Sequence, residues 1–427
     1  MQGLSTQRAP HPSVVLPHFA FGALSFLVLS FLMILASNEL TGHYFNGKIL
    51  AITHIATLGW ISMVIFGALY QLIPVVMEVA LYSEKLAKIN FTIFAIGIVL
   101  IVYTFWISQF GLILLIAATL LFIAIILFTI NIVLTAKSAE KWNIESSLIV
   151  SAVFWLFTTA LLGFLLSVNF KTVFLPEAHI TYLKAHAHTG MVGWFLLLII
   201  GVGSSLIPMF FLSHALNRKR LHWAFYLINS GMFIFFMDTV FIHKGFFILP
   251  VVLISAGIFS FMLFVRQSYK KRARKNLDIP LKHTVVSIIL MFVPIILAFF
   301  ISLESGMGMK LMLRINILYG VSILLGFITS LILGQAYKTL PFIIWLQRYQ
   351  NLVGKVKTPL PQHLYSEKVL NMQYWAFNLT VLFLFAGMLS GINLVIQIGN
   401  YLLLATAVLY NINIYKMYTH KIKTTEL

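Results

Sequence analysis

Residues 184–213 read KAHAHTGMVGWFLLLIIGVGSSLIPMFFLS, a stretch long and apolar enough to cross a bilayer. It opens with two histidines, His186 and His188. An earlier stretch, HIATLGWISMVIFGALYQLIPVV, begins at His54 and repeats the pattern. After both His54 and His188, a glycine, a tryptophan, a second glycine and a proline follow at offsets of 5, 6, 13 and 20. Four matches in register, each set beginning at a histidine, indicate an internal repeat.

A third copy begins at Val321, where the histidine is missing. At the same four offsets from Val321 the chain has Gly326, Phe327, Gly334 and Pro341. The three copies start 134 and then 133 residues apart. This spacing predicts a single integral membrane domain, 1–427, built from three repeat units at 1–140, 141–276 and 277–427.

The composition is that of a polytopic helical membrane protein. Of the 427 residues, 60% are hydrophobic and only 9% are charged, a balance that no soluble domain shows. Apolar runs separated by polar breaks predict twelve helices, at 14–37, 48–78, 87–107, 111–135, 147–169, 182–213, 221–242, 246–265, 284–303, 314–337, 373–392 and 398–415. The expected fold is therefore all-α, with three pseudo-symmetric four-helix units and the repeated motif on the second helix of each.

The basic residues predict the orientation in the membrane. With twelve spans both termini lie on one side, and that side holds 23 of the 29 Lys and Arg residues, Arg8 and Lys423 among them. By the positive-inside rule both termini are expected to be cytoplasmic, in a multi-pass protein of the plasma membrane. The loop RQSYKKRARKNLD at 266–278 suits anionic lipid headgroups, and nucleic-acid binding is a poor explanation for its charge.

Histidine is the main candidate ligand for a cofactor in this chain. The chain has no cysteine, which excludes disulfides, iron–sulfur clusters and thiolate-ligated haem. It has thirteen histidines, and the predicted topology gathers six of them towards the outer face: His43, His54, His179, His186, His188 and His243. Neutral imidazole is a good ligand for haem iron and for copper, so this one-sided cluster indicates a haem or metal site near that surface.

Helical geometry separates the two histidines of the H-x-H pair. At about 100° per residue, His186 and His188 point roughly 200° apart, so they serve two sites on opposite sides of one helix. The small residues of the repeat fall about 140–220° from His188 by the same rule, namely Gly193, Gly201 and Pro208. Such a stripe allows close helix packing and leaves the histidine facing a cavity. The same holds for His54 and its glycines.

At AHAHTGMVGWFLLLIIGVGSSLIP and THIATLGWISMVIFGALYQLIP the chain resembles subunit I of the haem–copper oxidases. That family has twelve helices in three pseudo-symmetric arcs, with an H-x-H pair on one helix and a single histidine on another. The resemblance implies that His54 and His188 are the axial ligands of a low-spin haem of the b type. It also implies that His186 binds a second haem, in an oxidoreductase of electron transport or respiration.

The chain departs from that family at the copper site. The family uses one histidine on its sixth helix and two adjacent histidines on its seventh, and no His-His pair exists here. His243, with His43 or His179, is the nearest substitute for copper ligation. The chain is also similar in size and histidine content to the twelve-helix haem- and copper-containing proteins of the nitric-oxide response. A separate electron-donor protein or partner subunit is expected, because no electron-entry domain is encoded.

Other functions stay open. Asp238 is a carboxylate inside a predicted span near His243, and such groups are costly and often functional. Asp238 is therefore a candidate for a proton relay or for a hydrogen bond to His243. Repeats and intramembrane polar groups also suit a transporter, although transporter repeats usually come as two halves. A haem-binding sensor without turnover is a third possibility. His18, in the first helix, is expected to be structural.

Overall fold

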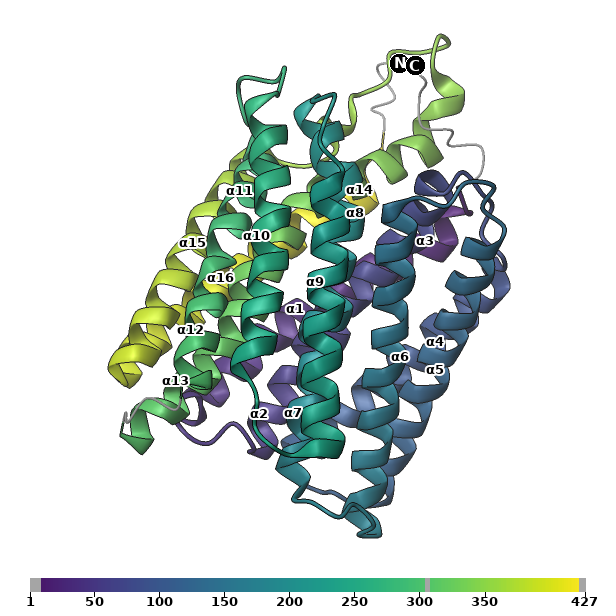
Figure 1. Ribbon diagram of the computed structural model, residues 1–427. Coiled ribbons are helices and arrows are strands. Elements are labelled where there is room, and N and C mark those ends of the chain that lie inside the picture. The colour runs from purple at the N-terminus through teal and green to yellow at the C-terminus, as the bar shows by residue number, and fades with distance from the viewer. Residues whose placement is uncertain (1–8, 304–307, 422–427) are drawn as a thin grey trace. The chain divides into compact units, whose positions relative to one another are not determined.

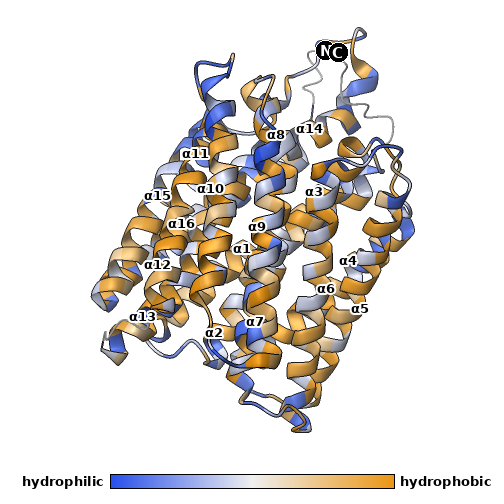
Figure 2. Cartoon of the chain, in the orientation of Figure 1, coloured by the Kyte–Doolittle hydropathy of each residue, from blue (hydrophilic) through white to orange (hydrophobic). Residues whose placement is uncertain are grey.

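The computed structural model describes residues 9–303 and 308–421, so Arg8 and Lys423 lie outside the described residues. Every regular element in the described part of the chain is a helix. Counting directly continuous helices together, twelve are long and apolar enough to cross a membrane. The predicted all-α polytopic membrane fold is therefore confirmed (Figure 1). Figure 2 shows hydrophobic residues along the helices and hydrophilic residues gathered at helix ends and in loops.

The first six spans, in chain order, are α1 (Pro12–Leu35); α2 (Gly47–His54), η3 (Ile55–Ser62) and α3 (Met63–Val76); α4 (Glu84–Trp106); α5 (Leu112–Lys137); α6 (Ile144–Lys171); and α7 (His179–His188), η4 (Thr189–Leu196) and α8 (Leu197–Phe211). The last six are α9 (Lys219–Met237) with η5 (Asp238–Ile242); α10 (Ile248–Lys270); α11 (Ile279–Leu290) with α12 (Phe292–Ser302); α13 (Met309–Val321), η6 (Ser322–Thr329), α14 (Ser330–Tyr349) and η7 (Gln350–Leu352); α15 (Glu367–Ser390); and α16 (Asn393–Thr419). Most predicted boundaries agree with these to within a few residues.

The tenth span is much longer than predicted. Hydropathy ended it at residue 337, because Lys338 interrupts the apolar run, whereas the structure continues the helix to Leu352. The Lys338 ammonium donates a hydrogen bond to the carboxylate of Asp278, which begins α11 as its N-cap. The charge that seemed to end the helix is thus neutralised by an ion pair, and the backbone continues past it.

The contacts divide the chain into two compact units. One is built mainly from Leu69–Asn276, where α4 packs on α5, α5 on α6, α6 on α7, η4 and α8, and α9 on α10. The other contains His11–Ala68, Leu277–Pro294 and Gly306–Leu427, where α1 packs on η3 and α16, α15 on α16, and α11 on α14. The compact units and the predicted repeat units share the boundary between Asn276 and Leu277 but otherwise divide the chain at different residues, and the repeat units stay a prediction.

Three spans contain a π-helical segment of eight residues: η3, η4 and η6. Each segment begins at the residue after the first position of a repeat, that is, after His54, His188 and Val321. In a π-helix each carbonyl oxygen accepts a hydrogen bond from the N–H group five residues later. Such segments are rare, and those that occur are often at functional sites. The same unusual segment at the same offset in all three copies supports the internal repeat, including the copy without histidine.

The π-helical segments alter the side-chain directions derived from an α-helix. The rotation of 100° per residue does not apply through η4, so the predicted angle between His188 and Gly193 does not hold. The close packing expected of the glycines is nevertheless present. A Cβ at Gly193 would lie 2.6 Å from Trp155 on α6, and one at Gly59 would lie 2.9 Å from Ser25 on α1.

Candidate functional site

His54 is the last residue of α2, and its ring is anchored within its own helix. Its Nδ1 lies 2.8 Å from the carbonyl oxygen of Leu50, one turn earlier. A carbonyl can only accept, so Nδ1 carries the proton and Nε2 is the nitrogen with the lone pair. The side chain is partly buried, and η3 starts at the next residue. His54 therefore presents one basic nitrogen in a fixed direction at the start of the π-helical segment.

His188 repeats this arrangement at the end of α7. Its Nδ1 donates to the carbonyl oxygen of Lys184, four residues earlier, over 2.9 Å. Its ring packs against Phe235 on α9, with 4.7 Å between the ring centroids. The tautomer is therefore the one found at His54, with the lone pair on Nε2. The two repeated histidines share their position, their anchoring bond and their tautomer.

His186 points to a different neighbour from His188. Its Nδ1 donates across to the carbonyl oxygen of Thr159 on α6 over 2.9 Å. The ring lies against Gly163, where an added Cβ would stand 2.8 Å from the His186 Cε1 atom. Because His186 contacts α6 and His188 contacts α9, the two rings face two different helices, as the sequence predicted. Each of the two histidines can thus serve its own site.

Asp238 and His243 are not joined through their side chains in the way the sequence suggested. The Asp238 carboxylate is 3% exposed and accepts the backbone N–H groups of Lys244, at 3.1 Å, and Gly245, at 3.0 Å. His243 is exposed, has a left-handed φ of 55°, and donates its backbone N–H to the Asp238 carbonyl oxygen. Asp238 therefore caps the turn after η5, and its contacts are those of a structural residue; the proton relay stays a prediction.

The residues expected to hold copper do not form a ligand set. Within residues 9–303 and 308–421, no group of three or more His, Asp or Glu side chains could hold a metal ion. His43 is exposed and stacks on Tyr44, while His179 lies 3.4 Å from the side-chain amide of Asn169. The described part of the chain therefore does not fit a three-histidine copper centre around His243.

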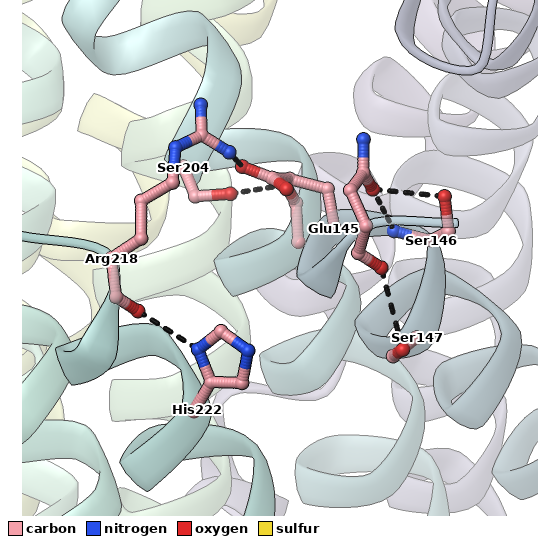
Figure 3. A network of polar contacts seen from close by, with 8 residues as sticks. Glu145, Ser146, Ser147, Ser204, Arg218 and His222 are labelled. Atoms are coloured by element: carbon pink, nitrogen blue, oxygen red, sulfur yellow. Dashed lines mark hydrogen bonds and ion pairs between the residues drawn. The ribbon is translucent and has the colours of Figure 1, made fainter. Parts of the chain in front are cut away.

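The sequence did not indicate an ion pair between the buried Glu145 and the exposed Arg218. Glu145, in the first turn of α6, is 1% exposed, and Arg218, the N-cap of α9, donates to its carboxylate (Figure 3). The Arg218 carbonyl in turn accepts from Nδ1 of His222 over 3.1 Å. A burial of this degree could not be read from the sequence, because an acid in a first helical turn is usually solvated and favoured by the helix dipole.

Two further histidines are buried away from these sites. His18 donates its Nδ1 proton to the carbonyl oxygen of Val14 over 2.8 Å, consistent with the structural role expected of it. His283 is fully buried and packs against Tyr374 and Phe377, with 4.9 and 5.7 Å between ring centroids. Neither ring nitrogen of His283 has a hydrogen-bond partner in the described part of the chain. Nothing in the sequence distinguished it from a surface histidine.

In comparisons with known proteins, no family model matches the chain and no curated protein matches it. The resemblance to the haem–copper oxidases therefore rests on the residues and motifs of the chain alone, and a relationship to that family stays a prediction.

Proposed function

We propose that this chain is a haem-binding integral membrane protein of the haem–copper oxidase type. Its role would be electron transfer or the chemistry of a diatomic gas, oxygen or nitric oxide, near the outer membrane face. One observation carries the proposal. His54 and His188 each precede an eight-residue π-helical segment, and each donates Nδ1–H to the carbonyl four residues earlier.

The donor set fits haem. An imidazole that donates its Nδ1–H to a carbonyl has a fixed ring orientation and a more basic Nε2. Histidines that bind metals in proteins commonly make such a bond. In the proposal His54 and His188 are the axial ligands of a low-spin haem, and the carbonyls of Leu50 and Lys184 hold their rings. The proposed haem is of the b type and is bound without covalent attachment, because thioether bonds need cysteine and the chain has none.

His186 is the proposed ligand of a second haem. Its ring position is set by the Thr159 carbonyl and by the space over Gly163, which a methyl group would fill. A haem held there by one histidine would supply gas binding and one-electron exchange. The Thr159 carbonyl would orient the histidine ring that holds it. Electrons would come from a separate donor protein or partner subunit.

The test is a dithionite-reduced minus oxidised optical spectrum of the purified protein, with haem quantified as the pyridine haemochrome. We expect a low-spin signal that is lost in both His54→Ala and His188→Ala. His222→Ala is the matched control, because the His222 ring makes the same bond to the carbonyl four residues earlier but lies outside the repeat. Full haem content in both ligand variants would refute the assignment.

Carbon monoxide tests the second site separately. A carbon monoxide shift that disappears in His186→Ala, while the low-spin signal persists, supports gas chemistry at His186. A low-spin signal without a shift leaves an electron-transfer cytochrome. Consumption of oxygen or nitric oxide by the pure protein separates an enzyme from a haem-binding sensor of the nitric-oxide-response type.

A transporter is the second candidate function, because internal repeats and intramembrane polar groups suit transporters, although transporter repeats usually come as two halves and this chain has three copies of its motif. The same spectrum decides between them, since a transporter purifies without colour.

A further inference from the structure

Two segments far apart in the sequence form one surface at an end of the first compact unit. The turn between α8 and α9 (residues 212–218) is bonded to the end of α10 and the loop after it (residues 266–275). Four hydrogen bonds join them: Asn217 N to Gln267 Oε1 (3.2 Å), Lys271 Nζ to Ala215 O (2.7 Å), Ser213 Oγ with Ser268 Oγ (2.6 Å) and Ala273 N to Leu212 O (3.4 Å). We call the side chains of these segments and of the first turn of α9 the basic surface.

The basic surface concentrates positive charge. It carries nine Lys and Arg residues and no acid: Arg218, Lys219, Arg220, Arg266, Lys270, Lys271, Arg272, Arg274 and Lys275. Arg218 is paired with the carboxylate of Glu145, which is itself buried. Like charges held this close by backbone and side-chain bonds repel one another, and an anion bound among them removes that cost.

The start of α9 adds to the positive electrostatic potential of the basic surface. Lys219 and Arg220 occupy the first turn, which holds no acidic residue, so two cations lie at the positive end of the helix dipole. Arg272 stacks over the ring of Tyr269 at 3.8 Å and donates from Nη1 to the Tyr269 carbonyl. The Nε of Arg272 is buried and has no partner in the described part of the chain. The helix dipole and the cations beside it therefore both favour an anion at this surface.

Apolar side chains lie beside these charges. Trp223 and Tyr226 on α9 are about 60% exposed, and Leu212 and Tyr269 are also exposed. Figure 2 shows the hydrophilic residues beyond α10 next to the hydrophobic length of the span. Aromatic residues at this level are typical of the membrane interface, where headgroups meet acyl chains. A ligand that combines a phosphate with hydrocarbon chains matches both parts of the surface, whereas a free anion matches only one.

We propose that the basic surface binds the headgroup of an anionic phospholipid. The Lys and Arg side chains contact the lipid phosphate, and the exposed aromatic side chains of α9 contact its acyl chains. A basic residue near a negatively charged leaflet contributes about 1 kcal/mol, so three of them together change the affinity by much more than tenfold. This site is independent of the histidines and of the proposed haem function.

The experiment uses the full-length purified protein in detergent and native mass spectrometry to count bound phosphatidylglycerol and phosphatidylcholine. The variant is Arg266→Gln/Lys270→Gln/Lys275→Gln, three exposed residues whose side chains make none of the four hydrogen bonds given above. The control is Lys355→Gln/Lys357→Gln/Lys368→Gln, three exposed lysines in the other compact unit, predicted to face the same side.

The expected result is retention of phosphatidylglycerol over phosphatidylcholine by the natural chain and by the control. The triple variant should bind phosphatidylglycerol at least about tenfold more weakly, and raising the salt from 0.05 to 0.5 M should weaken binding by the natural chain. Equal binding of phosphatidylglycerol by the variant and the natural chain overturns the proposal. So does displacement of the lipid by millimolar glycerol phosphate, which would identify a site for free phosphate esters.

Discussion

The position of His186 depends on the lack of a side chain at Gly163. An alanine Cβ there would lie 2.8 Å from Cε1 of His186, closer than real Cβ contacts allow, and 3.2 Å from Nδ1, which is tighter than most such contacts. We predict that Gly163→Ala displaces the ring and breaks its bond to Thr159, at a cost of about 1–3 kcal/mol in stability. If His186 holds a haem, the carbon monoxide shift is lost with it. Thermal unfolding and the carbon monoxide difference spectrum measure the two effects.

Gly203→Ala is the matched control for that substitution. It lies in α8 of the same compact unit, and the nearest atom to its new Cβ would be Ile207 Cδ1 at 3.4 Å, an ordinary contact. Alanine is the better helix former by about 0.5–1 kcal/mol, so this variant should be as stable as the natural chain or more so. Equal stability and equal spectra in both variants would contradict the role given to Gly163.

For single residues, the sequence indicated which histidines are candidate ligands, but it did not indicate which hydrogen bonds fix each ring. The separation of His186 from His188 follows from their spacing, and the structure agrees. The bonds to carbonyls at His54 and His188 depend on ring rotation, which no sequence pattern encodes. The bonds that the Asp238 carboxylate accepts from the backbone of the following turn could not be predicted from the sequence, because they depend on the conformation of that turn.

The π-helical segments are the elements that the repeats share, and in the second compact unit two of them are joined. Trp60 in η3 donates its indole N–H to the hydroxyl of Thr329 in η6 over 3.0 Å, and Trp60 is completely buried. The Thr329 hydroxyl in turn donates a hydrogen bond to the carbonyl oxygen of Leu324 over 2.8 Å. A buried donor that loses its acceptor costs the full desolvation of that group.

We therefore predict that Thr329→Val lowers the free energy of unfolding by about 1–3 kcal/mol, although valine nearly preserves the shape. Thr129→Val on α5 is the control, because the buried hydroxyl of Thr129 has no hydrogen-bond partner in the described residues. Thermal unfolding of the two variants in the same detergent measures the difference. An unchanged midpoint for Thr329→Val would show that the Trp60 bond contributes nothing to stability.

Element positions were predictable and element geometry was not. Apolar runs gave the existence of all twelve spans because lipid demands about twenty apolar residues per crossing. Hydropathy failed at Lys338, where an ion pair with Asp278 allows the helix to continue. The π-helical segments have the same composition as the α-helical turns beside them, so only the register of the backbone bonds distinguishes them.

For the whole molecule, the sequence repeat and the packing describe the chain in different ways. Three copies of one motif each carry a π-helical segment at the same offset. The contacts nevertheless gather the chain into two units, with boundaries within α3 and α12. A repeat is a relation between similar segments, whereas a compact unit reflects which helices touch. The first could be found from sequence, while the second needed coordinates.

The basic residues predict the orientation of the whole molecule in the membrane, and the lack of cysteine makes this prediction directly testable. Lys244, exposed in the turn between η5 and α10, is predicted to lie outside, and Lys275, exposed beyond α10, to lie in the cytoplasm. In intact cells a membrane-impermeant maleimide should label Lys244→Cys at once and Lys275→Cys only after permeabilisation. The natural chain gives the background, since it contains no thiol. Labelling in the reverse order would show that the topology is inverted. The proposed haem histidines would then lie near the cytoplasmic face, and the basic surface would face the leaflet with less anionic lipid.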